Sequence, residues 1–560
     1  MTTHRQMSVR ELLQGHGDSA AGSAGDIVVR GLALDSRHVN AQDAFVALAG
    51  AHAHGITFAP AASARGAAVI LAEKPIPSAR VPDVVLEHGT GPQRTEVEAN
   101  NDKTAAQAFC AATPPAGRSA WASTPGPEGE PRERRVNRDS GFHQERAVPV
   151  VWLDDLRDQL GAIASRFFGE PSRALTVIGV TGTNGKTSIV QLLAQALHHA
   201  GHRVATIGTL GAGLHGAIHA GERTTPDAIA VHSLLADFRD AGASHVAMEV
   251  SSHALEQRRV NAVAFDLAVF TNLTRDHLDY HGTMAAYGAA KQRLFAWPGL
   301  GAAVINVDDA FGRSLADTMP GGIVLLRYGI EDAEAEVVAS AIESGSSGQM
   351  FLLTTPWGAG TVATRLLGRF NVSNLLAVAG CLGQLGFSFA AIRTALAALD
   401  PVAGRMSRLG GVNAQPLVVV DYAHTPDALE QTLLSLRAHC SGRLICVFGC
   451  GGERDAGKRP EMGAIAERLA DHIVVTDDNP RGENGDAIVE QILAGLAQPF
   501  GATVERDRAT AIAQAIGIAQ PGDIVLIAGK GHEPYQEVDG QKRPFDDLAV
   551  ARRALEQRAC

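Results

Sequence analysis

Short apolar segments alternate with amphipathic segments along most of the chain, and this alternation predicts an α/β protein. After the apolar run at 175–180, apolar residues recur at helical spacing over 188–200, and strand-like and helix-like segments continue to alternate up to about residue 400. The alternation starts again near Pro401 and continues to residue 531. Strands separated by helices form parallel sheets with helices on their faces. We therefore expect two such α/β regions.

The first 86 residues contain shorter strand-like segments, and residues 87–147 interrupt them. This stretch is rich in Pro, Gly, Ser and charged residues and has few apolar anchors. Such a composition buries too little apolar surface to offset the entropy lost on ordering, so we predict a disordered insertion. The strand pattern resumes at 148–156. The predicted domains are 1–170, 171–400 and 401–560.

Composition narrows the class of protein. The 560 residues include 49 Lys+Arg and 60 Asp+Glu, a net charge of −11, which argues against a broad nucleic-acid-binding surface. The six cysteines have no framework spacing and suit a reducing compartment. No secretory signal and no apolar run long enough for a membrane span is visible. We expect a cytoplasmic protein without a nucleic acid partner or a membrane span.

The sequence VIGVTGTNGKTS (177–188) predicts a phosphate-binding loop between a strand and a helix. Backbone N–H groups in such a Gly-rich turn form an anion-binding nest, and the helix N-terminus adds positive potential. Lys186 would reach the terminal phosphates, and the Thr187 hydroxyl would bind Mg²⁺. The usual first glycine of the motif is replaced by Val180. A Gly-rich turn without a ligand is the alternative. The predicted ATP-binding residues here are Gly182, Thr183, Asn184, Gly185, Lys186, Thr187 and Ser188.

A second group of polar residues follows two other predicted strands. Glu249 ends the apolar run HVAME, and the segment DHLDYH contains Asp276, His277, Asp279 and His281. A carboxylate at a strand end beside a phosphate loop is well placed to hold Mg²⁺. DHLDYH can also be a solvated helix start with capping aspartates.

Eight motifs together resemble the Mur ligase family and cover nearly the whole chain outside 87–147. They are GTNGKT (182–187), MEVSSH (248–253), TNLTRDHLDYHG (271–282), GRFNVSN (368–374), DYAHTPD (421–427), FGCGGERDAGKRP (448–460), DNPR (478–481) and AGKGHE (528–533). The resemblance implies three domains: an N-terminal UDP-binding α/β domain, a central P-loop ATPase domain with a parallel sheet, and a C-terminal Rossmann-like domain that brings the amino acid.

The resemblance also implies the activity and the substrates. It points to an ATP-dependent, ADP-forming amide ligase of peptidoglycan precursor synthesis that adds meso-diaminopimelate to UDP-N-acetylmuramoyl-L-alanyl-D-glutamate. We expect this ligase to be a monomer. The UDP part would be held by Leu34, Ser36, Ala51, His52 and Ala53. The muramoyl dipeptide would be held by Thr224, Thr225, Ser251, Gln257 and Arg259.

Metal and nucleotide residues follow from the same resemblance. Glu249 and His277 match the family's metal ligands, and Lys291 matches a lysine that the family carries as a CO₂-derived carbamate (N6-carboxylysine). Carbamylation turns a cation into an anion and would add a ligand for Mg²⁺; from the sequence alone, Lys291 is an exposed helix lysine. The family's catalytic set would then be Lys186, Glu249, His277 and Lys291. Further ATP contacts would be Asn371, Asn374, Arg405, Asp421 and His424.

DNPR is the most informative substrate signal, although Asn-Pro is also a common turn start. Diaminopimelate differs from lysine in a second amino-acid head with its own carboxylate. Arg481 can bind that carboxylate through two parallel hydrogen bonds, and Asp478 and Asn479 can accept from the ammonium group. The resemblance completes this pocket with Arg454, Pro480, Gly529 and Glu533.

Three other functions remain open at this point. One is a lysine-adding ligase of the same family, against which Arg481 argues. A second is a ligase like folylpolyglutamate synthase, which would lack the UDP-binding domain. The third is a P-loop ATPase switch protein, which would hydrolyse ATP without an acceptor amino acid.

Overall fold

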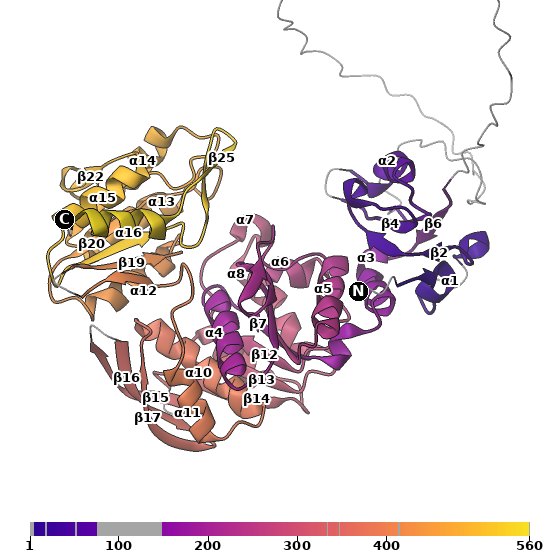
Figure 1. Ribbon diagram of the computed structural model, residues 1–560, viewed down its shortest axis with the longest axis horizontal. Coiled ribbons are helices and arrows are strands. Elements are labelled where there is room, and N and C mark those ends of the chain that lie inside the picture. The colour runs from indigo at the N-terminus through magenta and orange to yellow at the C-terminus, as the bar shows by residue number, and fades with distance from the viewer. Residues whose placement is uncertain are drawn as a thin grey trace, which may run out of the picture.

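A computed structural model describes residues 5–16, 20–50, 53–75, 148–332, 334–345, 348–412 and 415–558. The predicted insertion at 87–147 lies outside these residues. The fold class is confirmed: three α/β domains follow one another along the chain, and Figure 1 shows the first and the third on either side of the central one. Within the described ranges, every helix is too short or too polar to cross a bilayer.

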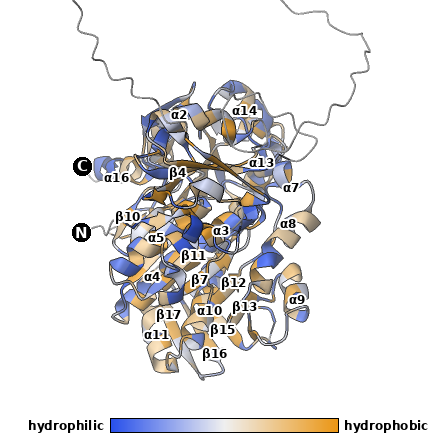
Figure 2. Cartoon of the chain, turned by 90° about the vertical axis from the view of Figure 1, so that its right-hand side faces the viewer, coloured by the Kyte–Doolittle hydropathy of each residue, from blue (hydrophilic) through white to orange (hydrophobic). Residues whose placement is uncertain are grey.

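The first domain is built on a parallel four-stranded sheet in the order β3-β4-β5-β6. β4 is buried along its whole length, and it is a largely hydrophobic strand in Figure 2. The strand expected after the predicted insertion is β6, which pairs with β5. The elements are β1 (Met7–Ser8), α1 (Val9–Leu12), β2 (Val28–Val29), β3 (Gly31–Ala33), β4 (Asp43–Ala47), α2 (Ala59–Ala64), β5 (Val69–Glu73), β6 (Val150–Leu153) and α3 (Leu156–Phe167).

The central domain contains an eleven-stranded sheet in the order β10-β9-β8-β11-β7-β12-β13-β14-β15-β16-β17. The strands from β8 to β14 are parallel, as predicted. Antiparallel strands extend the sheet at both edges, which the sequence analysis did not predict. The strands are β7 (Thr176–Thr181), β8 (Val204–Gly208), β9 (Gly211–Leu214), β10 (Ala217–His219), β11 (His245–Glu249), β12 (Leu267–Phe270), β13 (Ala302–Asn306), β14 (Val324–Gly329), β15 (Val337–Gly345), β16 (Gly348–Thr355) and β17 (Gly358–Thr364).

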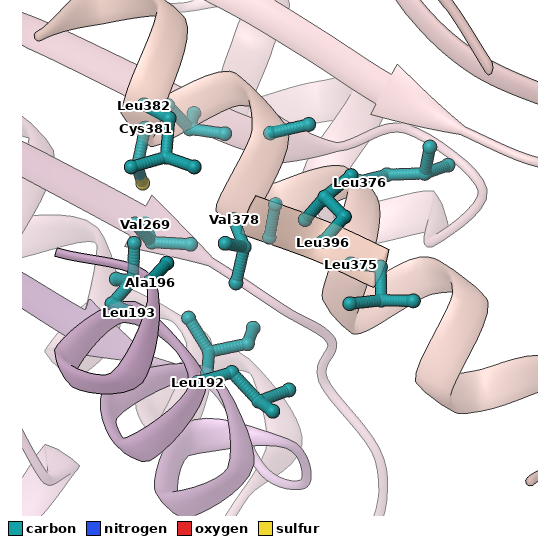
Figure 3. Packing of buried hydrophobic residues seen from close by; sticks show 14 of the residues in the cluster. Leu192, Leu193, Ala196, Val269, Leu375, Leu376, Val378, Cys381, Leu382 and Leu396 are labelled. Atoms are coloured by element: carbon teal, nitrogen blue, oxygen red, sulfur yellow. The ribbon is translucent and has the colours of Figure 1, made fainter. Parts of the chain in front are cut away.

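Helices pack on both faces of this sheet. Figure 3 shows one of these packing layers, in which Leu192 and Leu193 of α4 face Leu375 and Val378 of α10. Because these side chains are withdrawn from water, the layer fixes the helix that follows the phosphate loop. The helices are α4 (Lys186–His199), α5 (Ala228–Asp240), α6 (Ser252–Glu256), α7 (Leu278–His281), α8 (Met284–Gln292), α9 (Ala310–Asp317), α10 (Arg369–Gln384) and α11 (Phe389–Ala397).

The third domain has a six-stranded sheet in the order β18-β19-β23-β20-β21-β22, parallel except for β18. Successive residues of a strand point to opposite faces, so Val419 joins the core under α12 and α13, whereas Val418 and Val420 join the core under α15 and α16. The strands are β18 (Ser407–Gly410), β19 (Leu417–Asp421), β20 (Leu444–Phe448), β21 (His472–Val475), β22 (Thr503–Val504), β23 (Ile524–Ala528), β24 (Tyr535–Val538) and β25 (Gln541–Pro544). The helices are α12 (Pro426–Arg437), α13 (Lys458–Leu469), α14 (Gly485–Leu493), α15 (Arg508–Ile518) and α16 (Asp547–Arg558).

Candidate functional site

The predicted phosphate loop connects β7 to α4. Gly182 and Gly185 have φ values of 148° and 87°, a region that disfavours side chains, and this explains glycine at both positions. Gly185 also lies against α10, because a Cβ there would be 2.8 Å from Asn374 Oδ1. The helix begins at Lys186 without a side-chain cap, so its first N–H groups remain available to an anion.

The side chains of Lys186, Thr187 and Arg405 meet at this loop. Lys186 Nζ donates to the carbonyl oxygens of Gly182 and Thr183, each at 2.8 Å, and burial lowers the pKa of Lys186. Arg405 Nη2 donates to Thr187 Oγ1 at 3.1 Å. A lysine held over its own loop carbonyls has to turn outward to reach a phosphate.

Asn371 and Asn374, two of the predicted ATP contacts, lie on α10 and are both buried. Asn374 Nδ2 donates to Asn371 Oδ1 at 3.0 Å, and Asn371 Nδ2 donates to Leu367 O at 2.8 Å. Their contacts with each other and with Gly185 keep both amides beside the loop.

Asp421 is the last residue of β19, His424 follows it, and this strand end packs against the segment around Arg405. Asp421 Oδ2 accepts from Met406 N at 2.7 Å, and burial raises the pKa of Asp421 to about 6. The Arg405 guanidinium lies 4.5 Å from the centroid of the Tyr422 ring, and His424 Nδ1 contacts Tyr422 O at 2.8 Å. These contacts place Asp421 and His424 behind Arg405, which itself reaches the loop.

The three residues that resemble metal ligands come from β11, the N-cap of α7, and α8. Glu249 is 1% exposed and accepts from Thr209 N at 2.8 Å and Thr209 Oγ1 at 3.1 Å. The His277 side chain is 47% exposed. Lys291, 1% exposed, donates to Gly182 O at 2.8 Å, and its Nζ lies 4.3 Å from the centroid of the Tyr287 ring. Lys291 is therefore a buried lysine, not the exposed one that the sequence alone favours.

The side chains that would hold Mg²⁺ fit this ion if Lys291 carries a carbamate. The described residues contain no group of three or more His, Cys, Asp or Glu side chains arranged around a metal. Mg²⁺ prefers oxygen ligands, and Glu249 and Thr187 supply them, but an amine does not. Burial lowers the pKa of Lys291 well below its usual value, and the charge of Lys186 lowers it further. A neutral amine can form a carbamate, which would add the missing oxygen donors.

A cleft of about 840 Å³ lies between the first and central domains. Leu34 and Ser36 line it from the first domain, and Gln257 and Arg259 line it from the central domain. The structure thus brings predicted UDP-side and dipeptide-side residues to one cavity. Of the other UDP-side residues, Ala53 is exposed, and Ala51 and His52 lie outside the described residues.

Hydrogen bonds connect this cleft to Glu249. Arg259 Nη1 donates to Thr225 O at 3.0 Å, and Thr225 Oγ1 donates to Glu249 O at 2.8 Å. Ser251 N donates to Thr225 Oγ1 at 3.1 Å, and Thr224 Oγ1 lies 3.0 Å from Thr209 Oγ1. The predicted dipeptide residues therefore form a continuous path to the strand end that contains Glu249.

The predicted amino-acid pocket lies at the carboxyl ends of β21 and β23. Asn479 Nδ2 donates to Glu533 Oε2 at 2.8 Å. A Cβ on Gly529 would lie 2.6 Å from Asp478 Oδ2, so glycine permits this close approach. Arg481, whose preceding residue Pro480 is buried, donates through Nη1 to Gly452 O at 2.6 Å.

Arg454 is exposed. A Cβ on Gly451 would lie 3.0 Å from Arg481 Nη1 and 3.7 Å from Arg454 Cγ, so both arginines lie close to Gly451. The pocket region therefore combines carboxylate oxygens with two guanidinium groups.

Four residues at these sites were missed by the sequence analysis. Lys530 is fully buried and donates to Asn479 Oδ1 at 2.9 Å. Thr209 holds Glu249, and Tyr287 OH lies 3.2 Å from Thr183 Oγ1. Asp427 accepts from Asn184 Nδ2 at 2.8 Å. Tyr287 could have been found, because it precedes Lys291 by four residues on one helix face.

Three family models match the chain. They are the Mur ligase middle domain at 180–382, the Mur ligase glutamate ligase domain at 404–531, and the Mur ligase family catalytic domain at 28–103.

Curated relatives match almost the full length. The UDP-N-acetylmuramoyl-L-alanyl-D-glutamate--2,6-diaminopimelate ligase of Xanthomonas oryzae pv. oryzae is 52% identical over 536 residues, which cover 95% of this chain and 94% of the relative. A ligase of the same name from Ectopseudomonas mendocina is 55% identical over 414 residues, covering 74% of this chain and 84% of the relative.

Solved structures agree with these matches. A structure of a ligase with that same name has a TM-score of 0.65 at 33% identity and covers 99% of this chain and 100% of its own. MurF ligase from Thermotoga maritima in complex with ADP shares the fold, with a TM-score of 0.59 at 18% identity over 95% of this chain and 99% of its own. Folylpolyglutamate synthase of Mycobacterium tuberculosis shares the fold over only 66% of this chain and 91% of its own, with a TM-score of 0.54 at 19% identity.

Proposed function

The chain belongs to the Mur ligase family, and we propose that it joins meso-diaminopimelate to UDP-N-acetylmuramoyl-L-alanyl-D-glutamate, using ATP and releasing ADP. The observation on which the proposal rests is the 52% identity, over 95% of this chain, to a ligase named for this reaction. The remaining features of the site give each substrate a place.

The acceptor pocket supports diaminopimelate over lysine. Asp478 and Glu533 offer oxygen atoms to an ammonium group, and Arg454 and Arg481 offer guanidinium groups to a carboxylate. Asn479 Oδ1 already accepts from Lys530 Nζ and Glu537 N, so Asn479 orders the pocket from within. Diaminopimelate carries both groups at its distal end, whereas lysine carries only the ammonium. A lysine substrate would bring no carboxylate to Arg481, whose Nε lies 3.5 Å from Glu537 Oε2 in the protein itself.

The other residue roles are part of the proposal. UDP lies against Leu34, Ser36 and the 51–53 segment, and the dipeptide lies against Thr224, Thr225, Ser251, Gln257 and Arg259. ATP is bound by residues 182–188 together with Asn371, Asn374 and Arg405, while Asp421 and His424 support Arg405. The D-glutamyl γ-carboxylate then faces the phosphates at the end of β11.

Amide formation requires an activated carboxyl group, because oxide is a poor leaving group. The γ-carboxylate attacks the γ-phosphorus of ATP, which gives an acyl phosphate and ADP. The amine of diaminopimelate then attacks the acyl carbon, and the tetrahedral intermediate expels phosphate to leave the amide. Lys186 offsets negative charge on the phosphoryl group during transfer. Docking of the third domain excludes water from the acyl phosphate.

Members of the Mur ligase family use ATP and Mg²⁺. Thr187, Glu249, His277 and a carbamate on Lys291 would hold this ion, which neutralises phosphate charge when bound. The carbamate is part of the proposal. It is supported by the burial of Lys291 and by its lowered pKa, since only a neutral amine reacts with CO₂.

We extend the proposal to the organisation of the protein. The domain limits are 1–170, 171–400 and 401–560, the protein acts as a monomer, and the reaction takes place in the cytoplasm, where ATP is available.

Amino-acid-dependent ADP release tests the proposal. Purified protein receives ATP, Mg²⁺ and UDP-N-acetylmuramoyl-L-alanyl-D-glutamate, with meso-diaminopimelate, L-lysine or no acceptor. We expect ADP release and amide product with diaminopimelate only. Turnover with lysine alone would identify a lysine-adding ligase, and equal ADP release without any acceptor would identify an ATPase switch.

A further inference from the structure

The backbone of the phosphate loop is held by the central domain. Asn184 N donates to Asn272 Oδ1 at 2.9 Å, and Asn184 O accepts from Thr271 Oγ1 at 2.6 Å. Both partners follow β12, which pairs with the strand that precedes the loop. These contacts hold the backbone, and the Asn184 side chain makes its own bonds, one of them from Nδ2 to Thr274 Oγ1 of the same domain at 3.4 Å.

That side chain reaches the third domain. Asn184 Nδ2 donates to Asp427 Oδ2 at 2.8 Å, although the two residues lie 243 positions apart in the chain. Asp427 lies in the first turn of α12, which is capped by Thr425. The contact therefore joins the nucleotide loop directly to a helix of the domain that brings the amino acid.

The hydrogen bonds of Asp427 depend on docking of the third domain against the central domain. Asp427 is partly buried, and burial raises its pKa, while hydrogen bonds from Thr274 and Asn184 lower it. Both donors belong to the central domain. A partly buried carboxylate is unfavourable without hydrogen bonds, so Asp427 is satisfied in this environment when the two domains are together.

The same two domains also share an exposed ion pair. Arg275 and Glu461 lie 3.8 Å apart, but their side chains are 66% and 50% exposed. Exposed ion pairs contribute little to association. The Asn184–Asp427 contact is shorter, less exposed and located on the nucleotide loop itself.

We propose that Asp427 is a positioning residue that couples docking of the third domain to the conformation of the nucleotide loop through the side chain of Asn184. Docking then strengthens nucleotide binding, and by reciprocity a bound nucleotide favours docking. The inference rests on the proposed function only in taking ATP and ADP as ligands of the loop.

Binding of ADP–Mg²⁺ to the full-length protein, measured by calorimetry, tests the coupling. Asp427→Ala should weaken binding by roughly 10-fold or more, the usual consequence of losing a hydrogen bond to a charged group. Asp427→Asn keeps an acceptor oxygen and should lose less. Glu490→Ala is the matched control, because Glu490 is an exposed carboxylate on α14 of the same domain and is not among the groups that act on Asp427. It should bind as the wild type does.

A double-mutant comparison separates coupling from general damage. If Asp427 acts through Asn184, Asp427→Ala should have almost no further effect on ADP affinity in an Asn184→Ala background. X-ray scattering should show a larger radius of gyration for Asp427→Ala than for wild type.

Unchanged affinity of Asp427→Ala, or fully additive losses in the double variant, would overturn the inference. If Asp427→Ala does not fold, Asp427→Asn undergoes the same comparison. If neither variant folds, Asp427 is structural and the inference is wrong. A wild type that binds ADP but forms no amide would contradict the proposed function alone.

Discussion

At the scale of single residues, the chemistry of the site depends on charged groups whose pKa values are shifted by burial. Lys291 is buried beside Lys186, and Asp421 is buried behind Arg405. Sequence motifs identified these residues but could not show their burial. Thr209 and Lys530 were missed because their importance comes from contacts with Glu249 and Asn479, which lie far from them in the chain.

Arg481→Ala should change the choice of acceptor. Loss of the guanidinium should lower kcat/KM for meso-diaminopimelate by roughly 10- to 100-fold, because a hydrogen bond to a charged group is lost. The low activity with L-lysine should change little. Steady-state ADP release with both amino acids measures this ratio. Arg468→Ala, on an exposed part of α13, serves as the control. An unchanged preference for diaminopimelate would remove Arg481 from the proposed acceptor site.

Asp421 should make stability depend on pH. Because its pKa is raised to about 6, above an ordinary value of about 4, the folded protein binds this proton more readily than the unfolded chain. Protonated Asp421 therefore stabilises the folded protein; this stabilisation is complete below about pH 4 and is lost as the pH rises through about 6. Relative to Asp421→Asn, the wild type should therefore lose up to roughly 3 kcal/mol of unfolding free energy between pH 4 and 7.

Urea unfolding of both proteins across this pH range measures the difference. A difference that does not vary with pH would show that the pKa of Asp421 is not raised.

At the scale of secondary-structure elements, the sequence predicted the strands that have helices between them. β16 was missed because apolar residues occupy both of its faces: Met350 and Leu352 are exposed, while Phe351 and Leu353 are buried. The period of two that identifies a half-buried strand is therefore hidden in the sequence. β15 and β17, which pair with β16, were missed along with it.

The α4–α10 packing layer should dominate the stability of the central domain. Leu193 is fully buried in this layer, so Leu193→Ala should lower the free energy of unfolding by about 2–5 kcal/mol, through lost burial and a residual cavity. Leu434→Ala is the matched control, because Leu434 is 46% exposed on α12, and its effect should be well under 1 kcal/mol. Chemical denaturation of the full-length protein compares the unfolding free energies of the two variants. Equal losses of unfolding free energy would contradict the dominant role of the α4–α10 layer.

At the scale of the whole molecule, the order of the three domains could be predicted because each brings its own motifs. The contacts between domains could not. Asn184 and Asp427 each belong to a recognisable motif, yet nothing local to either one indicates that they meet. Likewise, the cleft shared by Leu34 and Arg259 forms only when the first and central domains are placed together.

Removal of residues 87–147 should leave the ligase intact. β5 and β6 are parallel neighbours, and a parallel crossover needs about a dozen residues. Residues 74–86 and 148–149 still meet that length. We expect kcat/KM for each substrate and the unfolding midpoint to stay within experimental error of the wild type. A loss of activity of more than about 10-fold, with the unfolding midpoint unchanged, would assign the removed segment a functional role.

The pairing of β5 with β6 has a practical consequence. β5 and β6 are adjacent strands of one sheet, and β6 forms the edge of that sheet. A guest sequence placed between them extends a connection without shifting the register of either strand. This junction is therefore a suitable place to graft a fluorescent reporter or an affinity tag while both chain ends remain unaltered.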